Sequence, residues 1–150
     1  MTDYLPPAII AALVIGAAST GALFTPGPWY EQLAKPSWTP PNWLFPVAWT
    51  VLYAMIAYAG YRVWSIEGIG PATIVWAIGL AFNAAWSWIM FGEHKIGMAL
   101  ADLTLMWLSI AAFIVLAWPI DRTAAYLFMP YFAWATFAGA LNYEVWRLNS

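Results

Sequence analysis

The chain has 150 residues, of which 64% are hydrophobic and only 8% are charged, and its formal net charge is −2. Soluble domains carry about a quarter charged residues, so this composition excludes an ordinary soluble globule, a disordered chain and a basic nucleic-acid-binding domain. Cysteine is absent, which excludes disulfides, thiolate metal sites and cysteine nucleophiles. The length suits about five membrane crossings of roughly 20 residues each.

Five apolar runs, separated by proline, glycine and charged residues, predict the transmembrane helices. In chain order they cover residues 6–24, 41–64, 72–91, 96–118 and 124–146. Each run is apolar on all sides, as lipid-embedded helices are. The first run lacks the preceding Lys or Arg of a signal peptide, so we expect it to be retained. We therefore predict an all-α, multi-pass integral membrane protein, with a single bundle of five transmembrane helices over residues 1–150.

The connection between the first two predicted helices, residues 25–40, is the longest and most aromatic loop. It contains Trp29, Tyr30 and Trp38 together with four prolines, which stiffen the chain by fixing φ. A stiff aromatic loop of this length is typical of a lid whose rings contact a ligand. The alternative is an interfacial segment that only anchors the helices, because Trp and Tyr gather at membrane surfaces.

Several polar and aromatic residues fall in one layer of the predicted bundle, beneath this loop. At 1.5 Å of rise per residue, Trp49, Asn83, Asp102 and Ala138 lie roughly 9–12 Å below the surface, and Trp134 lies about 18 Å below it. Helical spacing adds side chains on the same faces: Tyr53 with Trp49, Trp86 with Asn83, and Leu141 with Trp134 and Ala138. We expect a cavity in this layer, where a flat ring could stack on tryptophan; ordinary bundle packing is the alternative.

The remaining polar residues do not form a catalytic pattern. Asp102 is a carboxylate inside a helix, so it is a functional candidate; the alternative is a neutral group, or one paired with Asn83 or a tryptophan N–H. His94 lies in a short turn, and Glu144 is spaced to pair with Arg147. The sequence has no nucleophile–base pair, metal-ligand cluster or glycine-rich phosphate loop, which argues against a hydrolase, a metalloenzyme and an ATP-driven pump. A binding protein for a large apolar ring system fits this pattern.

The third predicted helix carries a stripe of small residues, Ala77, Ala81 and Ala85, at every fourth position. Small residues at this spacing let another helix approach closely, so they predict a homodimer through this helix. Packing within one subunit is the alternative.

A short string near the end of the last helix, with Leu141, Tyr143 and Arg147, fits the proposed L-x-Y-x₃-R cholesterol pattern. The pattern is weak and abundant, so it gives sterol binding little support by itself.

The strongest motif is WYEQLAKPSWTPP at residues 29–41, which fits the pattern WYxxLxKPxWxPP. Further matching strings are PVAWTVLY at 46–53, LAFNAAW at 80–86, FG at 91–92, PYFAW at 130–134 and LNYEVWR at 141–147. Together they resemble the TspO/MBR family, the tryptophan-rich sensory and translocator proteins, also called the peripheral-type benzodiazepine receptor. The resemblance spans about residues 21–147 and is to bacterial-type members.

The resemblance implies a five-helix membrane protein, often dimeric, in a bacterial envelope membrane. It implies a pocket beneath the first loop that binds porphyrins such as protoporphyrin IX or haem, sterols and benzodiazepine-type drugs, with no other cofactor. By position, Trp49 and Trp134 match pocket tryptophans linked in bacterial members with light-dependent porphyrin breakdown. Other positions match the pocket lining (Asn83, Ala138 and Leu141) and the sterol motif (Tyr143 and Arg147). The implied role is a tetrapyrrole sensor or carrier; the alternative is a light-dependent porphyrin-degrading enzyme.

Overall fold

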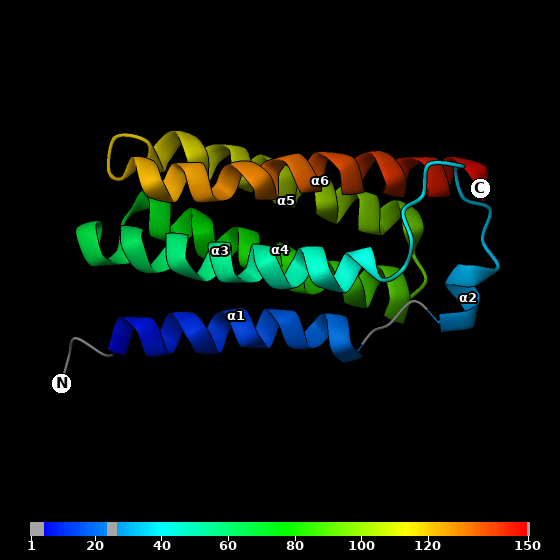
Figure 1. Ribbon diagram of the computed structural model, residues 1–150, viewed down its shortest axis with the longest axis horizontal. Helices are drawn as coiled ribbons and strands as arrows, with labels where there is room; N and C mark the ends of the chain where they lie inside the picture. The colour runs from blue at the N-terminus through cyan, green and yellow to red at the C-terminus, as the bar shows by residue number, and fades with distance from the viewer. Residues whose placement is uncertain (1–4, 24–26, 150) are drawn as a thin grey trace.

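The computed structural model describes residues 5–23 and 27–149 and is built from long helices (Figure 1). These are α1 (Leu5–Leu23), α3 (Leu44–Glu67), α4 (Pro71–Ser87), α5 (Ile96–Ala117) and α6 (Arg122–Leu148). Two short elements join them: α2 (Gly27–Glu31), and η2 (Trp88–Gly92), a π-helical turn that continues α4. With η2 counted as part of α4, the five long helices are long and apolar enough to cross a membrane, which confirms the predicted fold class.

The segment predicted as a loop, residues 25–40, differs from that prediction in two ways. It contains the short helix α2, and the following helix begins at Leu44 rather than at residue 41. This later start places Pro46 in the first turn of α3, where its missing N–H leaves no helical hydrogen bond unmade. Residues 24–26, on which the predicted end of the first helix and start of the loop fall, lie outside the described residues.

The long helices lie side by side along the long axis of the molecule (Figure 1). Helix α1 packs on α3 and α4, α6 packs on α3 and α5, and α5 also packs on α4. Helix α2 and the end of α6 lie at the same end of the bundle, opposite the start of α1. We call this the loop end.

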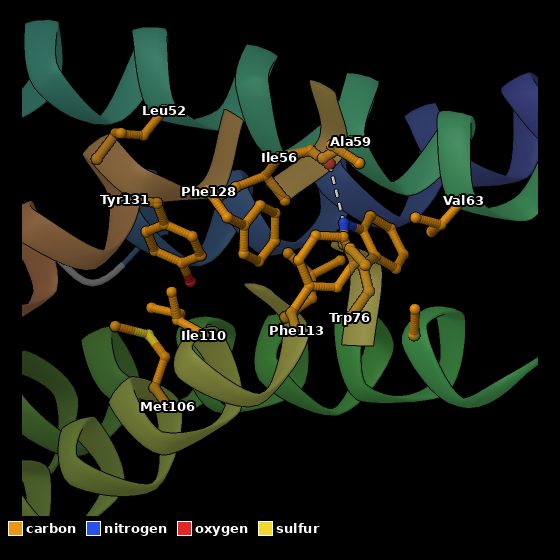
Figure 2. Packing of buried hydrophobic residues seen from close by; sticks show 14 of the residues in the cluster. Leu52, Ile56, Ala59, Val63, Trp76, Met106, Ile110, Phe113, Phe128 and Tyr131 are labelled. Atoms are coloured by element: carbon orange, nitrogen blue, oxygen red, sulfur yellow. Dashed lines mark hydrogen bonds between the residues drawn. The ribbon is translucent and has the colours of Figure 1, made fainter. Parts of the chain in front are cut away.

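The centre of the bundle is a buried apolar core, and a polar bond lies within it where α3 crosses α4 (Figure 2). The indole Nε1 of Trp76 donates to the carbonyl oxygen of Ile56 at 2.9 Å, and Trp76 is only 2% exposed. In lipid such an N–H has no water to bond, so the protein must supply the acceptor. Gly60 makes the approach possible, because a Cβ there would lie 2.4 Å from the Trp76 ring.

Helix α1 has a simpler attachment to the bundle. It buries Ile10, Val14 and Ala17 against the core. Its hydroxyl groups bond its own backbone: Ser19 donates to Ile15 and Thr20 donates to Ala17, both at 2.7 Å. Apolar packing therefore holds α1 to α3 and α4.

At the end opposite the loop end, an ion pair joins two helices. The Arg62 guanidinium near the end of α3 donates from Nη2 to Oδ1 of Asp121 at 3.1 Å and from Nε to Oδ2. Asp121 directly precedes α6, and this hydrogen bonding lowers the pKa of its carboxyl. The pair fixes the start of α6 beside α3.

The Gly60–Trp76 contact predicts that Gly60→Ala destabilises the protein by about 1–3 kcal/mol, because the added methyl overpacks the α3–α4 crossing. Thermal unfolding in detergent, followed by loss of the monodisperse peak, measures the effect. Gly16→Ala is the matched control, since a Cβ at Gly16 meets nothing within 4 Å. Equal melting temperatures for the two variants would contradict the prediction.

Candidate ligand-binding site

Trp49 of α3 and Trp134 of α6, the two tryptophans predicted to contact a ligand, touch each other in the loop-end half of the bundle. Their ring centroids are 6.4 Å apart and their planes are nearly perpendicular, at 89°. Further rings continue the contact on both sides. We call the whole set the aromatic cluster: Phe45, Trp49, Tyr53, Tyr131, Trp134 and Phe137. Edge-to-face contacts of this kind stabilise by about 0.5–1.5 kcal/mol each beyond area burial.

A buried amide side chain bonds the two tyrosine hydroxyls of the aromatic cluster. Asn83 of α4 is 5% exposed. Its Oδ1 accepts a hydrogen bond from the Tyr53 hydroxyl at 2.7 Å, and its Nδ2 donates to the Tyr131 hydroxyl at 2.9 Å. This chain of bonds joins α3, α4 and α6 in the layer where the sequence placed Asn83, Tyr53 and Trp49 together. Tyr131, whose ring Figure 2 shows pointing into the core, was not among the predicted residues.

The aromatic residues of the predicted lid divide between two places. Trp38 reaches the aromatic cluster, with its ring 5.6 Å from that of Phe137. Trp29 instead stacks on His94, with centroids 4.1 Å apart and planes 5° apart. Tyr30 is buried and meets Phe91 of η2 edge-on at 5.6 Å. Trp38 thus contacts the aromatic cluster through Phe137, whereas Trp29 and Tyr30 pack in a different part of the loop end.

Tyr30 belongs to a second apolar cluster under the loop. We call it the loop-end cluster: Tyr30, Ile89, Met90, Ala99, Leu141 and Val145. Trp86 packs against both the bundle core and the loop-end cluster. Phe45 packs against the loop-end cluster and on Trp134 of the aromatic cluster. Burial raises the pKa of the Tyr30 phenol.

Two polar side chains fix the loop in place. The Lys35 ammonium donates to the carbonyl oxygens of Tyr30, Glu31 and Leu33 at 2.8, 3.3 and 3.2 Å, which caps the end of α2. Asn149, just after α6, pairs with the backbone of Ala34. Its Oδ1 accepts from the Ala34 N–H at 2.9 Å and its Nδ2 donates to the Ala34 carbonyl at 2.8 Å. The loop is thus tied to the end of α6.

The predicted common face of Trp134, Ala138 and Leu141 is divided in the structure. Ala138 packs with the core beside Trp134, whereas Leu141 is buried in the loop-end cluster. Trp86 was predicted to contact a ligand, but its indole is held within the protein, because its Nε1 donates to Oδ1 of Asn142 at 3.0 Å. Leu141 therefore belongs to the loop-end cluster, and Trp86 lies where that cluster meets the bundle core.

Asp102 of α5 is buried, 7% exposed, but the predicted pairing with Asn83 or a tryptophan N–H is wrong. Asn83 is engaged by Tyr53 and Tyr131, and Oδ2 of Asp102 has no hydrogen-bond partner in the described part of the protein.

The pairing of Glu144 with Arg147 is confirmed, with Nη2 of Arg147 donating to Oε2 of Glu144 at 2.6 Å. Over residues 5–23 and 27–149, no group of three His, Asp or Glu side chains is placed to hold a metal ion.

The remaining predicted residues lie outside the aromatic cluster. Within the sterol string, Leu141 is buried while Tyr143 and Arg147 are exposed, so the three do not share a surface. Within the alanine stripe, Ala77 and Ala81 are exposed on α4, which is inconsistent with packing against another helix of the same subunit. The stripe is shorter than predicted, because Ala85 packs against the loop-end cluster.

Comparison with known proteins agrees with this architecture. The sequence model of the TspO/MBR family matches residues 8–147. The chain belongs to the TspO/MBR family. It is 45% identical over 137 residues to protein CrtK of Rhodobacter capsulatus, covering 89% of this chain and 86% of that protein.

Two further TspO/MBR relatives extend the comparison. The chain is 46% identical over 132 residues to the tryptophan-rich sensory protein of Cereibacter sphaeroides, covering 88% of this chain and 84% of that protein. It is 41% identical over 126 residues to the translocator protein of Homo sapiens, covering 81% and 75%. The family thus contains membrane sensor and translocator proteins, and the resemblance stated from the sequence is confirmed.

Some residues of the TspO/MBR site were missed by sequence reasoning. Tyr131 lies three residues before Trp134 and Asn142 lies four after Ala138, so helical spacing was a usable signal for both. Phe45, four residues before Trp49, and Phe137, three residues after Trp134, have the same helical spacing. They were passed over because an apolar ring in an apolar run is usually ordinary core. Asn149 contacts Ala34 across 115 residues of sequence, a distance that no local pattern reports.

The Asn149–Ala34 pair predicts that Asn149→Ala loosens the loop, because two hydrogen bonds of about 0.5–1.5 kcal/mol each are lost. Amide hydrogen exchange should speed up about fivefold or more over residues 33–35, while exchange in the middle of α5 stays unchanged. Leu148→Ala, one residue earlier, is the control. Unaltered exchange in Asn149→Ala would show that the pair does not order the loop.

Proposed function

We propose that this integral multi-pass TspO/MBR protein is a receptor or sensor that binds porphyrins, such as protoporphyrin IX or haem, in the aromatic cluster. The observation that carries the proposal is the direct contact of Trp49 with Trp134 in a nearly charge-free layer, with Trp38 of the loop joined through Phe137. Flat aromatic ligands stack on such rings. The tetrapyrrole class itself comes from the resemblance to the family, as does a regulatory or transport role in tetrapyrrole metabolism.

Binding requires the aromatic cluster to open. A flat ring held between two others needs about 7–8 Å between their planes, because carbon atoms pack at about 3.5–4.0 Å. The rings of Trp49, Tyr53, Tyr131 and Trp134 instead contact one another at centroid distances of 5.5–6.4 Å. The cavity of about 230 Å³ between α5 and α6 is lined by Trp107 and Thr136, not by these rings. On this proposal the ligand replaces ring–ring contacts, and opening the cluster also changes the contact of Trp38 with Phe137.

Titration with protoporphyrin IX tests the proposal. Tryptophan fluorescence should be quenched saturably in the wild type, and Trp134→Phe should raise the dissociation constant by roughly twofold to tenfold, as expected for loss of a stacking contact. Trp118→Phe, at the opposite end of the bundle, is the matched control. Quenching that stays linear up to the solubility limit in the wild type would refute specific binding.

The enzymatic alternative is tested in the same samples. Under illumination, a photo-oxidative enzyme would bleach the porphyrin absorption band faster in the wild type than in a Trp49→Phe/Trp134→Phe variant. Equal bleaching in both would leave binding as the only activity of the site.

The exposed alanines of α4 support a homodimer as part of the proposal. Ala77 and Ala81 present a flat surface, and in lipid close backbone approach is what drives helices together. A two-fold axis would bring the same surface of a second copy against it.

Ala81→Leu should therefore convert the dimer to a monomer in detergent, because the larger side chain separates the two helices. Light scattering coupled to size exclusion measures the mass. Ala101→Leu, exposed on α5, should leave the mass unchanged. A dimeric Ala81→Leu protein would exclude this surface as the interface.

A further inference from the structure

The polar side chains in the loop-end half of the bundle are almost all bonded within the protein. Asn83 bonds both tyrosines, and Asn142 accepts from Trp86 and donates to the Ile96 carbonyl at 3.2 Å. The Thr104 hydroxyl donates to its own helix at 2.8 Å. Within residues 5–23 and 27–149, only two buried side-chain atoms have no hydrogen-bond partner in the protein: Oδ2 of Asp102 and Nε1 of Trp134.

These two atoms belong to the same region as the aromatic cluster. Trp134 is a member of that cluster. Asp102 lies between Ala99 and Met106 on the buried face of α5, and its neighbours Leu103 and Met106 belong to the same buried core as Tyr131. Tyr131 in turn contacts Trp49. One atom is an acceptor and the other is a donor, so a single ligand can serve both.

A buried polar atom without a partner destabilises the folded state, and within a membrane no bulk water relieves the cost. The bundle elsewhere meets this requirement with protein groups, as Trp76 and Ile56 show. Polar atoms kept at a cost to stability are typical of functional sites. The destabilisation caused by the unpartnered atoms of Asp102 and Trp134 is removed once a bound molecule supplies a donor to the first and an acceptor to the second.

We propose that Asp102 and the Trp134 indole N–H are reserved for the ligand, which donates an N–H or O–H group to Asp102 and offers an acceptor to Trp134. The inference rests on the proposed function and adds to it a requirement for polar groups on the ligand. Protoporphyrin IX meets this requirement through its two propionic acid groups, because a protonated carboxyl donates its O–H and a carboxylate offers acceptor oxygens. A purely apolar ring of the same size does not.

The experiment replaces Asp102 by the similarly shaped apolar Leu and measures two quantities. Without ligand, Asp102→Leu should raise the melting temperature by about 3 °C or more, because an unpartnered polar group is removed. The dissociation constant for protoporphyrin IX should rise about tenfold. Asp102→Asn, which keeps an acceptor oxygen, should bind more tightly than Asp102→Leu. Ser109→Ala is the control, since that hydroxyl is already bonded to the Met106 carbonyl at 2.6 Å.

Three outcomes would count against the proposal. A lower melting temperature for Asp102→Leu, or an unfolded variant, would show that Asp102 holds the fold and would overturn the inference. A higher melting temperature with unchanged porphyrin affinity would also overturn it. If wild-type protein shows no saturable porphyrin quenching, the proposed function fails, and the melting comparison still decides whether Asp102 is kept at a cost to stability.

Discussion

The structure depends on one constraint, that a helix bundle in lipid must provide hydrogen-bond partners for its own polar groups. Without bulk water, a buried side-chain donor or acceptor needs a hydrogen-bond partner from the protein, often on another helix. The Trp76 indole on α4 donates to the Ile56 carbonyl on α3, and Asn83 joins Tyr53 to Tyr131 across three helices. These bonds set which face of each helix turns inward. Apolar packing alone would allow many rotations of an all-apolar helix.

The sequence predicted the helices and the common level of Trp49 and Asn83 because both follow from simple geometry. Hydrophobic run length gives the number of crossings, and a constant rise per residue places Trp49 and Asn83 at one level. Their association through Tyr53 follows from that level. The first loop was correctly identified as distinctive, because four prolines and three large aromatics are unusual in a connection.

The rotation of each helix was not predictable, and the errors follow from that. Leu141 shares a helical face with Trp134 by spacing, but α6 is buried over so wide an arc that the two residues join different clusters. Ala85 turns inward where Ala81 does not. For Asp102, pairing with Asn83 or a tryptophan N–H was one of the interpretations considered, because buried acids normally have a partner. Only the full set of contacts shows that Asn83 is engaged by Tyr53 and Tyr131, and that the unpartnered N–H of Trp134 does not reach Asp102.

The attachment of α1 has a consequence for the order in which the molecule comes apart. Its hydroxyls bond only their own helix among the described contacts, whereas α3, α4 and α6 are cross-linked by buried polar bonds. Separating α1 therefore costs apolar contact area but breaks none of the hydrogen bonds that join the other helices. Under a pulling force applied at the N-terminus, α1 should leave first, and the four remaining helices should resist as one mechanical unit.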